Sequence, residues 1–257
     1  MRLLGIFAWS VVEDAMHRKV FYIILALTVL LIFLIPLLPS AQLGVQVDLM
    51  REAALGLTTI MAFILAIIMG ATIVPRDANQ RTIYNIISKP VQRWHYFMGK
   101  FLGIMLVVAF TLALIFLVMV IFVFAKFRVF DPGLLKALFT IFLEASILTS
   151  LVMMASVYLS PLVSIFLAIL FYVVAHAKGD YLYSAMNNGN PVAKIGAGFL
   201  YYIFPNLERF NINETIAHGE RVFRVGAVNL ILLTLMAAAF SSIFLYLGVY
   251  LFSRRDL

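Results

Sequence analysis

Long apolar runs separated by short polar segments dominate the chain. A helix that spans about 30 Å of hydrocarbon needs roughly 20 apolar residues. Five runs reach this length, and a sixth, shorter run follows Pro161 directly. We therefore predict an all-α integral membrane protein, a single transmembrane domain over residues 1–257 with six transmembrane helices. The predicted spans are residues 20–38, 53–74, 101–125, 138–159, 162–177 and 228–252.

The pair Ser160-Pro161 divides the fourth predicted span from the fifth. Proline removes a backbone donor and clashes with the preceding helical turn, so a helix is not expected to continue through it. The alternative is one kinked helix of about 40 residues, which is too long to cross a bilayer once. We therefore predict two spans joined by a tight turn.

Two polar segments contain apolar positions of their own. Residues 1–19 are amphipathic and predict an elbow helix lying in the headgroup plane, the alternative being a frayed terminus. Its apolar positions are Leu3, Leu4, Phe7, Val11 and Ala15, and its polar positions are Glu13, Asp14, His17 and Arg18. The long connection 178–227 contains the apolar run 195–204, which is too short to span and predicts a re-entrant or interfacial element.

Composition excludes a soluble enzyme. The chain is 64% hydrophobic and 12% charged, whereas a soluble domain carries about 25% charged residues. The net charge of +7 does not indicate nucleic-acid binding, because most Lys and Arg residues lie between apolar runs, where they face lipid headgroups. There is no cysteine, so neither a disulfide nor a thiolate metal site is possible.

Charge leaves the orientation nearly undecided. With six spans both termini lie on the same side, which has ten Lys and Arg residues against nine on the other. Five of the nine are in the long connection 178–227. Long loops cross the membrane with little regard to charge, so the count favours cytoplasmic termini.

Motifs for catalysis are missing from the sequence. It has no GxxxxGK[ST] phosphate loop, HExxH, GxSxG or CxxC. The four histidines are scattered, so neither a metal site nor enzyme activity is expected in this chain. Glu144 is the one acidic residue inside a predicted span. It either lines a path or takes a proton, or it is a snorkelling or interface group that pairs with a basic residue or stays neutral.

The connection between the second and third spans predicts a docking element. Pro75 is expected to end the second span, and Lys89-Pro90 would end a short helix that begins at Thr82. That helix would present Ile83, Ile86 and Ile87 on one side. Exposed apolar residues on a short helix must dock, either on the same subunit and the headgroups or on a soluble partner.

Residues 82–103, TIYNIISKPVQRWHYFMGKFLG, resemble a signature of the ABC-2 type transporter permeases. In that family the element after the second span reads roughly T-x-x-x-L-L-S-x-P-V-x-R, followed by an aromatic residue and G-K-F/L. The elbow helix, the six spans and the re-entrant element before the last span are similar too. The compact form resembles the permease of the nitrous-oxide reductase maturation transporter. Arg81 departs from the pattern, because many members have glycine there.

The resemblance implies a division of labour between chains. Two permeases, identical or homologous, would pair in the inner membrane of a prokaryote, with both termini cytoplasmic. Each would rest on a separate cytoplasmic ABC ATPase that holds the ATP and Mg²⁺, so no cofactor is expected in this chain. The implied coupling helix comprises Arg81, Thr82, Ile83, Tyr84, Asn85, Ile86 and Ile87, and its flanks are Arg76, Asp77, Lys89, Pro90 and Arg93.

An exporter is the function that this arrangement predicts. The alternative is an ATP-driven membrane module that acts on or anchors a periplasmic protein, and a membrane enzyme is disfavoured because clustered acids or histidines are missing. The apolar spans favour a lipid-like or amphiphilic cargo. Gly99 and Gly103 have the small-xxx-small spacing that permits close helix approach, within the subunit or between subunits.

Overall fold

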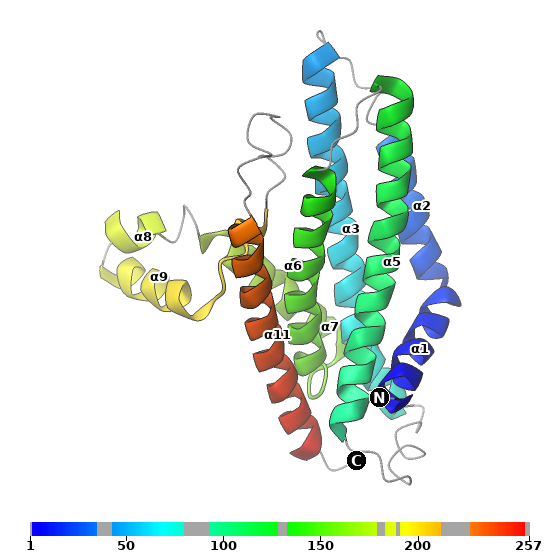
Figure 1. The fold of residues 1–257 in the computed structure, drawn as a ribbon. Coiled ribbons are helices and arrows are strands. Elements are labelled where there is room, and N and C mark those ends of the chain that lie inside the picture. Colours follow the sequence, from blue (N-terminus) through cyan, green and yellow to red (C-terminus); the bar gives the residue numbers. More distant parts are fainter. Residues whose placement is uncertain are drawn as a thin grey trace.

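The computed structural model describes residues 2–34, 43–79, 93–127, 133–178, 183–188, 191–211 and 227–254. All regular structure in these ranges is helical, which confirms the predicted all-α class (Figure 1). The helices are α1 (Arg2–Met16), α2 (Lys19–Leu34), α3 (Leu43–Asn79), α5 (Arg93–Phe127), α6 (Gly133–Ala155), α7 (Pro161–His176), α8 (Tyr183–Asn188), α9 (Pro191–Ile203), the 3₁₀ helix η3 (Glu208–Phe210) and α11 (Ala227–Arg254).

An up-and-down bundle forms the body of the molecule. Its helices alternate in direction, so that α1 begins and α11 ends at the same end of the bundle (Figure 1). Within the described ranges, four segments are long and apolar enough to span a membrane: Glu52–Asp77, Arg93–Ile121, Gly133–Ala155 and Val228–Arg254. The chain is therefore a multi-pass membrane protein.

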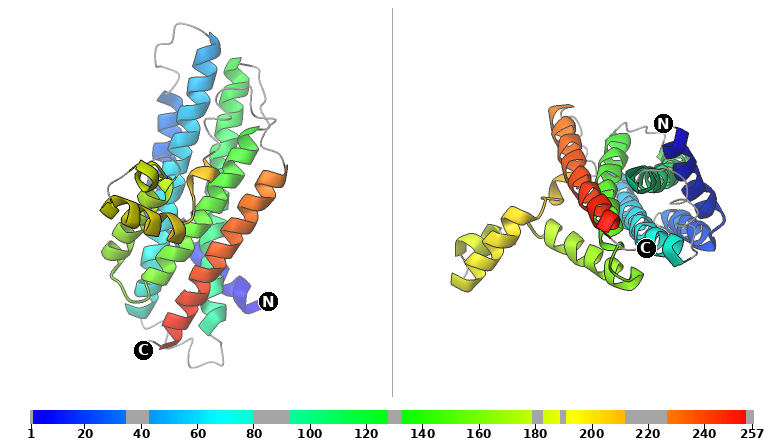
Figure 2. Two further views of the ribbon diagram at one scale, coloured as in Figure 1. Left: turned by 90° about the vertical axis from the view of Figure 1, so that its left-hand side faces the viewer. Right: turned by 90° about the horizontal axis from the view of Figure 1, so that it is seen from below.

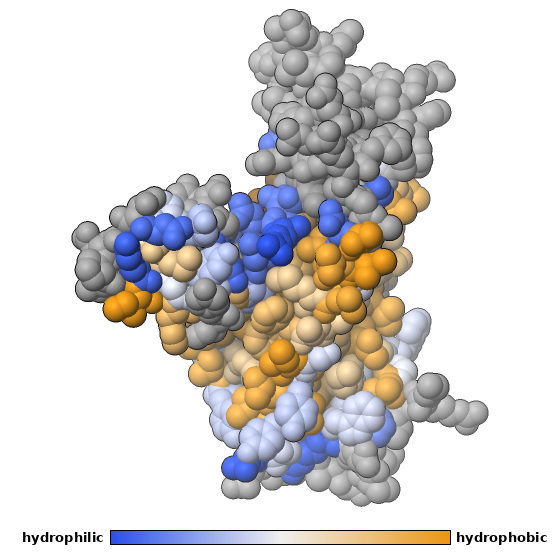
Figure 3. All heavy atoms as spheres, turned by 60° about the vertical axis from the view of Figure 1, so that its left-hand side comes forward, coloured by the Kyte–Doolittle hydropathy of each residue, from blue (hydrophilic) through white to orange (hydrophobic). Residues whose placement is uncertain are grey.

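The two remaining predicted spans are shorter helices. α2 follows α1 at a bend of 64°, and α7 is an apolar helix of 16 residues. Both run along the bundle (Figure 2). Among the described residues there are four candidate spans, or five if the bent pair α1–α2 is one span, and the count of six stays a prediction. Apolar side chains form a band across the middle of the bundle, with polar side chains above and below it (Figure 3).

Two helix ends differ from the prediction, and one predicted break is seen. The prediction that Pro75 ends the second span is wrong, because α3 continues through Pro75 to Asn79. The lost backbone hydrogen bond is offset by side-chain contacts of Arg76 and Asp77 in the following turn. α6 ends at Ala155, earlier than expected, and α7 begins with Pro161 at its first turn, where proline needs no donor.

Helix α6 lies at the centre of the bundle and contacts α3, α5, α7 and α11. The approach to α3 is close at Gly70, where an added Cβ would lie 3.3 Å from the Cβ of Val152. Outward faces are apolar on α7 and α11, as Phe166 at 69% and Tyr246 at 73% exposure show. These faces are suited to lipid or to another membrane subunit.

The connection before α11 contains a helix over the run that was predicted to be re-entrant or interfacial. α9 holds the apolar run 195–204 almost entirely and projects sideways from the bundle with α8 (Figure 2). Past α9 the chain returns to the end of α7, where Lys178 Nζ donates a 2.7 Å hydrogen bond to the carbonyl of Phe204 and the amide of Leu207 donates to the carbonyl of Ala175. An exposed crosswise helix fits the membrane boundary, and a re-entrant role stays a prediction.

Candidate functional site

The candidate site lies at the end of the bundle where α1 begins and α11 ends (Figure 1). The last turn of α3 and the first turn of α5 flank residues 80–92 there, beside α1 and the last turn of α11. We call this cluster the basal site. Its polar side chains are Asp14, Arg18, Arg76, Asp77, Arg93, Tyr96 and Lys100.

The α1–α5 contact positions the basal site. A Cβ at Gly99 would lie 2.6 Å from the Cβ of Phe7, and one at Gly103 would lie 2.6 Å from the Cβ of Val11. Real Cβ atoms do not approach so closely, so only glycine permits this packing. The small-xxx-small pair therefore acts within the chain, between α1 and α5.

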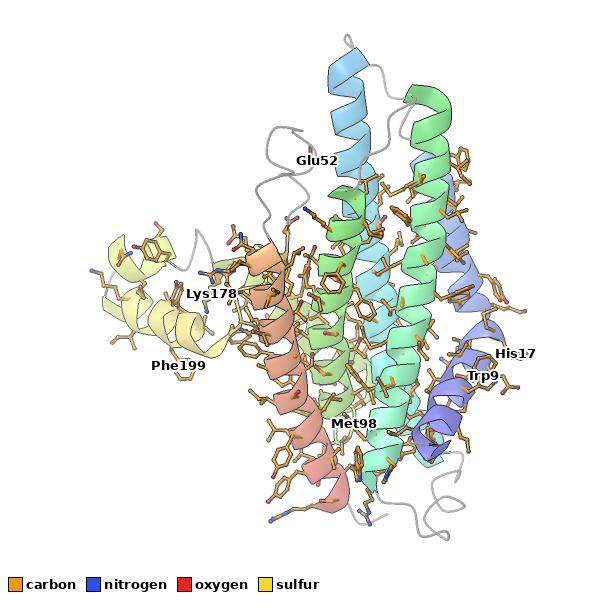
Figure 4. All side chains as sticks on the ribbon, in the orientation of Figure 1. Trp9, His17, Glu52, Met98, Lys178 and Phe199 are labelled. Carbon is orange, nitrogen blue, oxygen red and sulfur yellow. The ribbon has the colours of Figure 1, made fainter. Side chains whose placement is uncertain are left out.

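This contact also changes the interpretation of the elbow helix. The apolar face that was expected to lie in the headgroups is packed on protein, with Val11 and Ala15 each 1% exposed. Outward apolar residues of α1 include Ile6, at 62% exposure, and Trp9, at 68% exposure. Figure 4 labels Trp9. Helical periodicity found an apolar face, but it could not tell that the face contacts α5 instead of lipid.

Asp14 joins α1 to α3. Its carboxylate receives hydrogen bonds from Arg76, with Nη2 at 2.6 Å and Nη1 at 2.7 Å, and from Arg18 Nε at 3.0 Å. Burial raises the pKa of Asp14, but the hydrogen bonds and charges of Arg76 and Arg18 outweigh burial and hold the pKa below its ordinary value. The carboxylate is therefore ionised at neutral pH and fixes the turn after Pro75.

Asp77 joins α3 to α5 at a buried position. Its Oδ2 accepts a 2.9 Å hydrogen bond from the hydroxyl of Tyr96 and lies 2.9 Å from Lys100 Nζ. The side chains of Asp77 and Lys100 are 6% and 9% exposed. Lys100 also reaches Ser10 of α1 at 3.4 Å. Removing one partner of such a pair leaves an uncompensated buried charge, which costs about 3–5 kcal/mol.

Arg93 joins the start of α5 to the end of α11. Its Nη1 donates hydrogen bonds to the carbonyls of Phe252 at 2.9 Å and Ser253 at 2.8 Å. These carbonyls belong to the last turn of α11, which lacks intrahelical partners and favours a cation. The rings of Tyr96 and Phe252 stack with centroids 5.5 Å apart. Both ends of the connection 80–92 are therefore attached to neighbouring helices.

Glu144 lies eleven residues from each end of α6 and is buried. His176 Nε2 of α7 lies 3.2 Å from Glu144 Oε1. The pair borders a pocket of about 200 Å³ that α3, α6, α7 and the segment after α9 enclose. Among the described residues, no group of three or more His, Cys, Asp or Glu could hold a metal ion.

Comparison with known families decides the assignment. The sequence profile of the ABC-2 family transporter protein matches residues 8–257, almost the whole chain. This protein belongs to the ABC-2 transporter family. It is therefore a transmembrane permease component of an ABC transporter, a kind of subunit that is typically not catalytic itself, and the family implies partnership with ABC ATPase subunits. Among curated proteins none matches the chain.

Some of the predicted site residues of the ABC-2 permease lie together in the structure, and others lie outside the described residues. Arg76, Asp77 and Arg93 all hold the ends of the connection 80–92. The predicted coupling helix, Arg81 to Ile87, lies outside the described residues, as do Lys89 and Pro90. Sequence reasoning missed the roles of Tyr96 and Lys100 altogether, because an aromatic residue and a lysine at the start of a span also suit an ordinary membrane boundary.

Replacing Gly103 with alanine tests the α1–α5 contact in the ABC-2 permease. The added Cβ would collide with Val11, and overpacking of this kind costs about 1–3 kcal/mol. We expect the midpoint of thermal unfolding in detergent to fall by several degrees. Gly5→Ala in α1 is the matched control, because nothing lies within 4 Å of a Cβ there. An unchanged midpoint for Gly103→Ala would contradict the packing.

Replacing Asp14 with asparagine tests the α1–α3 link. We expect a loss of about 1 kcal/mol at neutral pH. Because the pKa of Asp14 is lowered in the folded state, this difference is full above the ordinary aspartate value of about 3.9 and shrinks as the pH falls toward the folded value. Unfolding midpoints of both proteins from pH 7 down to about pH 3 measure the difference. Glu13→Gln, an exposed neighbour, should show neither effect.

Proposed function

We propose that this ABC-2 permease is the exporter subunit of an inner-membrane transporter of a prokaryote, pairs with a second permease, and is driven by separate cytoplasmic ATPases. ATP and Mg²⁺ bind to the ATPases. The basal site faces the cytoplasm with both termini, and residues 81–87 form the coupling helix. The observation that carries the proposal is the attachment of both ends of the connection 80–92. Ion pairs of Arg76 and Asp77 hold one end, and hydrogen bonds from Arg93 to the backbone of α11 hold the other.

This attachment explains how a push on the connection would move the bundle. A displacement at residue 80 acts on Arg76 and Asp77, which are held by α1 and α5. A displacement at residue 92 acts on Arg93, which holds the end of α11. Separating the buried Asp77–Lys100 pair costs several kcal/mol, so the helices would move together with the connection.

Outward apolar surfaces support the proposed pairing and the proposed cargo. α7 and α11 have outward apolar faces that a second permease or lipid would cover. An apolar groove of about 780 Å³ runs between α5, α6 and α11. These surfaces suit a pathway for an amphiphilic molecule more than one for a bare ion.

A second candidate function is an ATP-driven module that acts on a periplasmic protein. The observation that favours it is the projection of α8 and α9 from the bundle (Figure 1). Ile195 and Phe199 of α9 are 76% and 66% exposed. Such a helix can lie on the bilayer surface or contact a protein partner. The resemblance of the compact form to the permease of the nitrous-oxide reductase maturation transporter stays a prediction.

Co-purification with the cognate ATPase tests the proposed coupling helix. We expect the double variant Ile83→Glu/Ile86→Glu to lose ATPase binding, because charges replace the predicted apolar docking face. The ATPase activity that depends on the complex should fall with it. Glu13→Gln serves as the control for an exposed position on the same side. Full binding by the double variant would contradict docking through residues 81–87.

A charge-deletion series tests whether the buried pair transmits movement. Asp77→Asn and Lys100→Met should each lower stability by about 3–5 kcal/mol, since Lys100 would lose its buried counter-ion and Asp77 would keep, among the described cations, only Arg76 Nε, 4.0 Å from its Oδ1. The double variant Asp77→Asn/Lys100→Met removes both charges and should recover most of the stability. We expect the recovered protein to bind the ATPase but to show transport at least tenfold below wild type. Normal transport by the double variant would show that the pair has a structural role only.

A further inference from the structure

The pocket beside Glu144 is an unexplained polar site in an otherwise apolar bundle. Glu144 lies at its base with the side chain 3% exposed, whereas the side chain of His176 is 23% exposed nearer the surface. The pocket has a volume of about 200 Å³. Its lining residues are Gly56, Thr59, Ile60, Ile141, Glu144, Tyr172, His176, Phe210 and Asn211.

The carboxylate of Glu144 is not satisfied by the protein. Although His176 Nε2 lies 3.2 Å from Oε1, the two atoms lack hydrogen-bond geometry, and Oε1 receives no hydrogen bond from any described residue. Thr140, one turn earlier, donates to the carbonyl of Ala137 instead. A buried carboxylate oxygen without a donor is costly, so a group that supplies a hydrogen bond or positive charge to Oε1 would bind there favourably.

The lining restricts the chemistry of that group. An anion is excluded by the carboxylate, and a divalent metal would need several carboxylate or carbonyl oxygens, whereas the described lining contains one carboxylate. The volume holds only a few non-hydrogen atoms, because one water occupies about 30 Å³ in the liquid. The oxygen-bearing side chains of Thr59, Glu144 and Asn211 border this space. A small cation with several N–H donors meets these conditions.

We propose that this pocket binds a primary ammonium group, with Glu144 as its counter-ion and His176 beside the entrance. The ligand is either a water-soluble amine or the ammonium head of an amphiphile. Binding to the permease does not depend on the proposed export function. The further claim that the bound amine is cargo does depend on it.

Isothermal titration of the purified full-length permease with ethylammonium chloride tests the proposal. At pH 8 an imidazole with an ordinary pKa of about 6.5 is neutral and does not compete for Glu144, whereas an alkylammonium stays charged, as a lysine does. The other titratable residue of the described lining is Tyr172. We expect saturable binding of ethylammonium and none of ethanol, with sodium chloride matched between titrations.

Three variants separate charge from shape. Glu144→Gln keeps the side-chain size and should weaken ethylammonium binding at least tenfold. Gly56→Leu should also abolish binding, because nothing lies within 4 Å of a Cβ at Gly56 and the side chain would occupy the pocket without changing its charge. Thr149→Val is the matched control on α6, a buried hydroxyl outside the lining, and should bind normally.

Each outcome decides the proposal. Tighter binding of octylammonium than of ethylammonium supports an amphiphile as the natural source, and equal binding supports a soluble amine. No saturable binding by folded wild type, or equal binding by Glu144→Gln, overturns the proposal and indicates a water-filled pocket. If Glu144→Gln does not fold, Gly56→Leu alone decides. Amine binding together with failure of ATPase co-purification would leave this site standing and reject the transporter coupling.

Discussion

The buried pair of Asp77 and Lys100 is the interaction on which the base of this ABC-2 permease depends. An aspartate with 6% and a lysine with 9% side-chain exposure are each unfavourable alone, and at 2.9 Å each compensates the other. Tyr96 supplies the hydrogen bond that a second carboxylate lone pair requires. Because Asp77 is on α3 and Lys100 on α5, the pair also fixes the register between the two helices that flank the connection 80–92.

Most of the fold could be predicted from local patterns in the sequence. Apolar runs predicted the long membrane helices, and the backbone chemistry of proline predicted the separate start of α7 at Pro161. The same rule failed at Pro75, because the contact between Arg76 and Asp14 holds the turn beyond it across 62 residues of sequence. A local pattern in the sequence does not show which residues far apart in the chain come into contact. The predicted coupling residues rest on the family resemblance, because an exposed apolar face does not show which partner it binds.

The surroundings of Glu144 also depend on a contact between residues far apart in the sequence. Its place in a span was readable from hydropathy, and so were its two possible roles. The residue that lies next to it was not, because His176 belongs to a different helix and ends it, 32 positions later in the chain. The proline that starts α7 is what brings the two together, since it turns the chain back along α6. The proline that separates α6 from α7 thus determines the surroundings of the Glu144 carboxylate.

Helix α3 provides a physical connection between the two polar sites. It carries Asp77 at the base and Thr59 in the pocket, 18 residues or about 27 Å apart along one helix. Between them, Gly70 is the point of close approach to α6. A tilt of α3 that begins at the basal site would pivot where backbone and side chain are in tight contact, and Thr59 would then move relative to Glu144. Rigid-body motion of one packed helix suffices for such coupling, without any change inside α6.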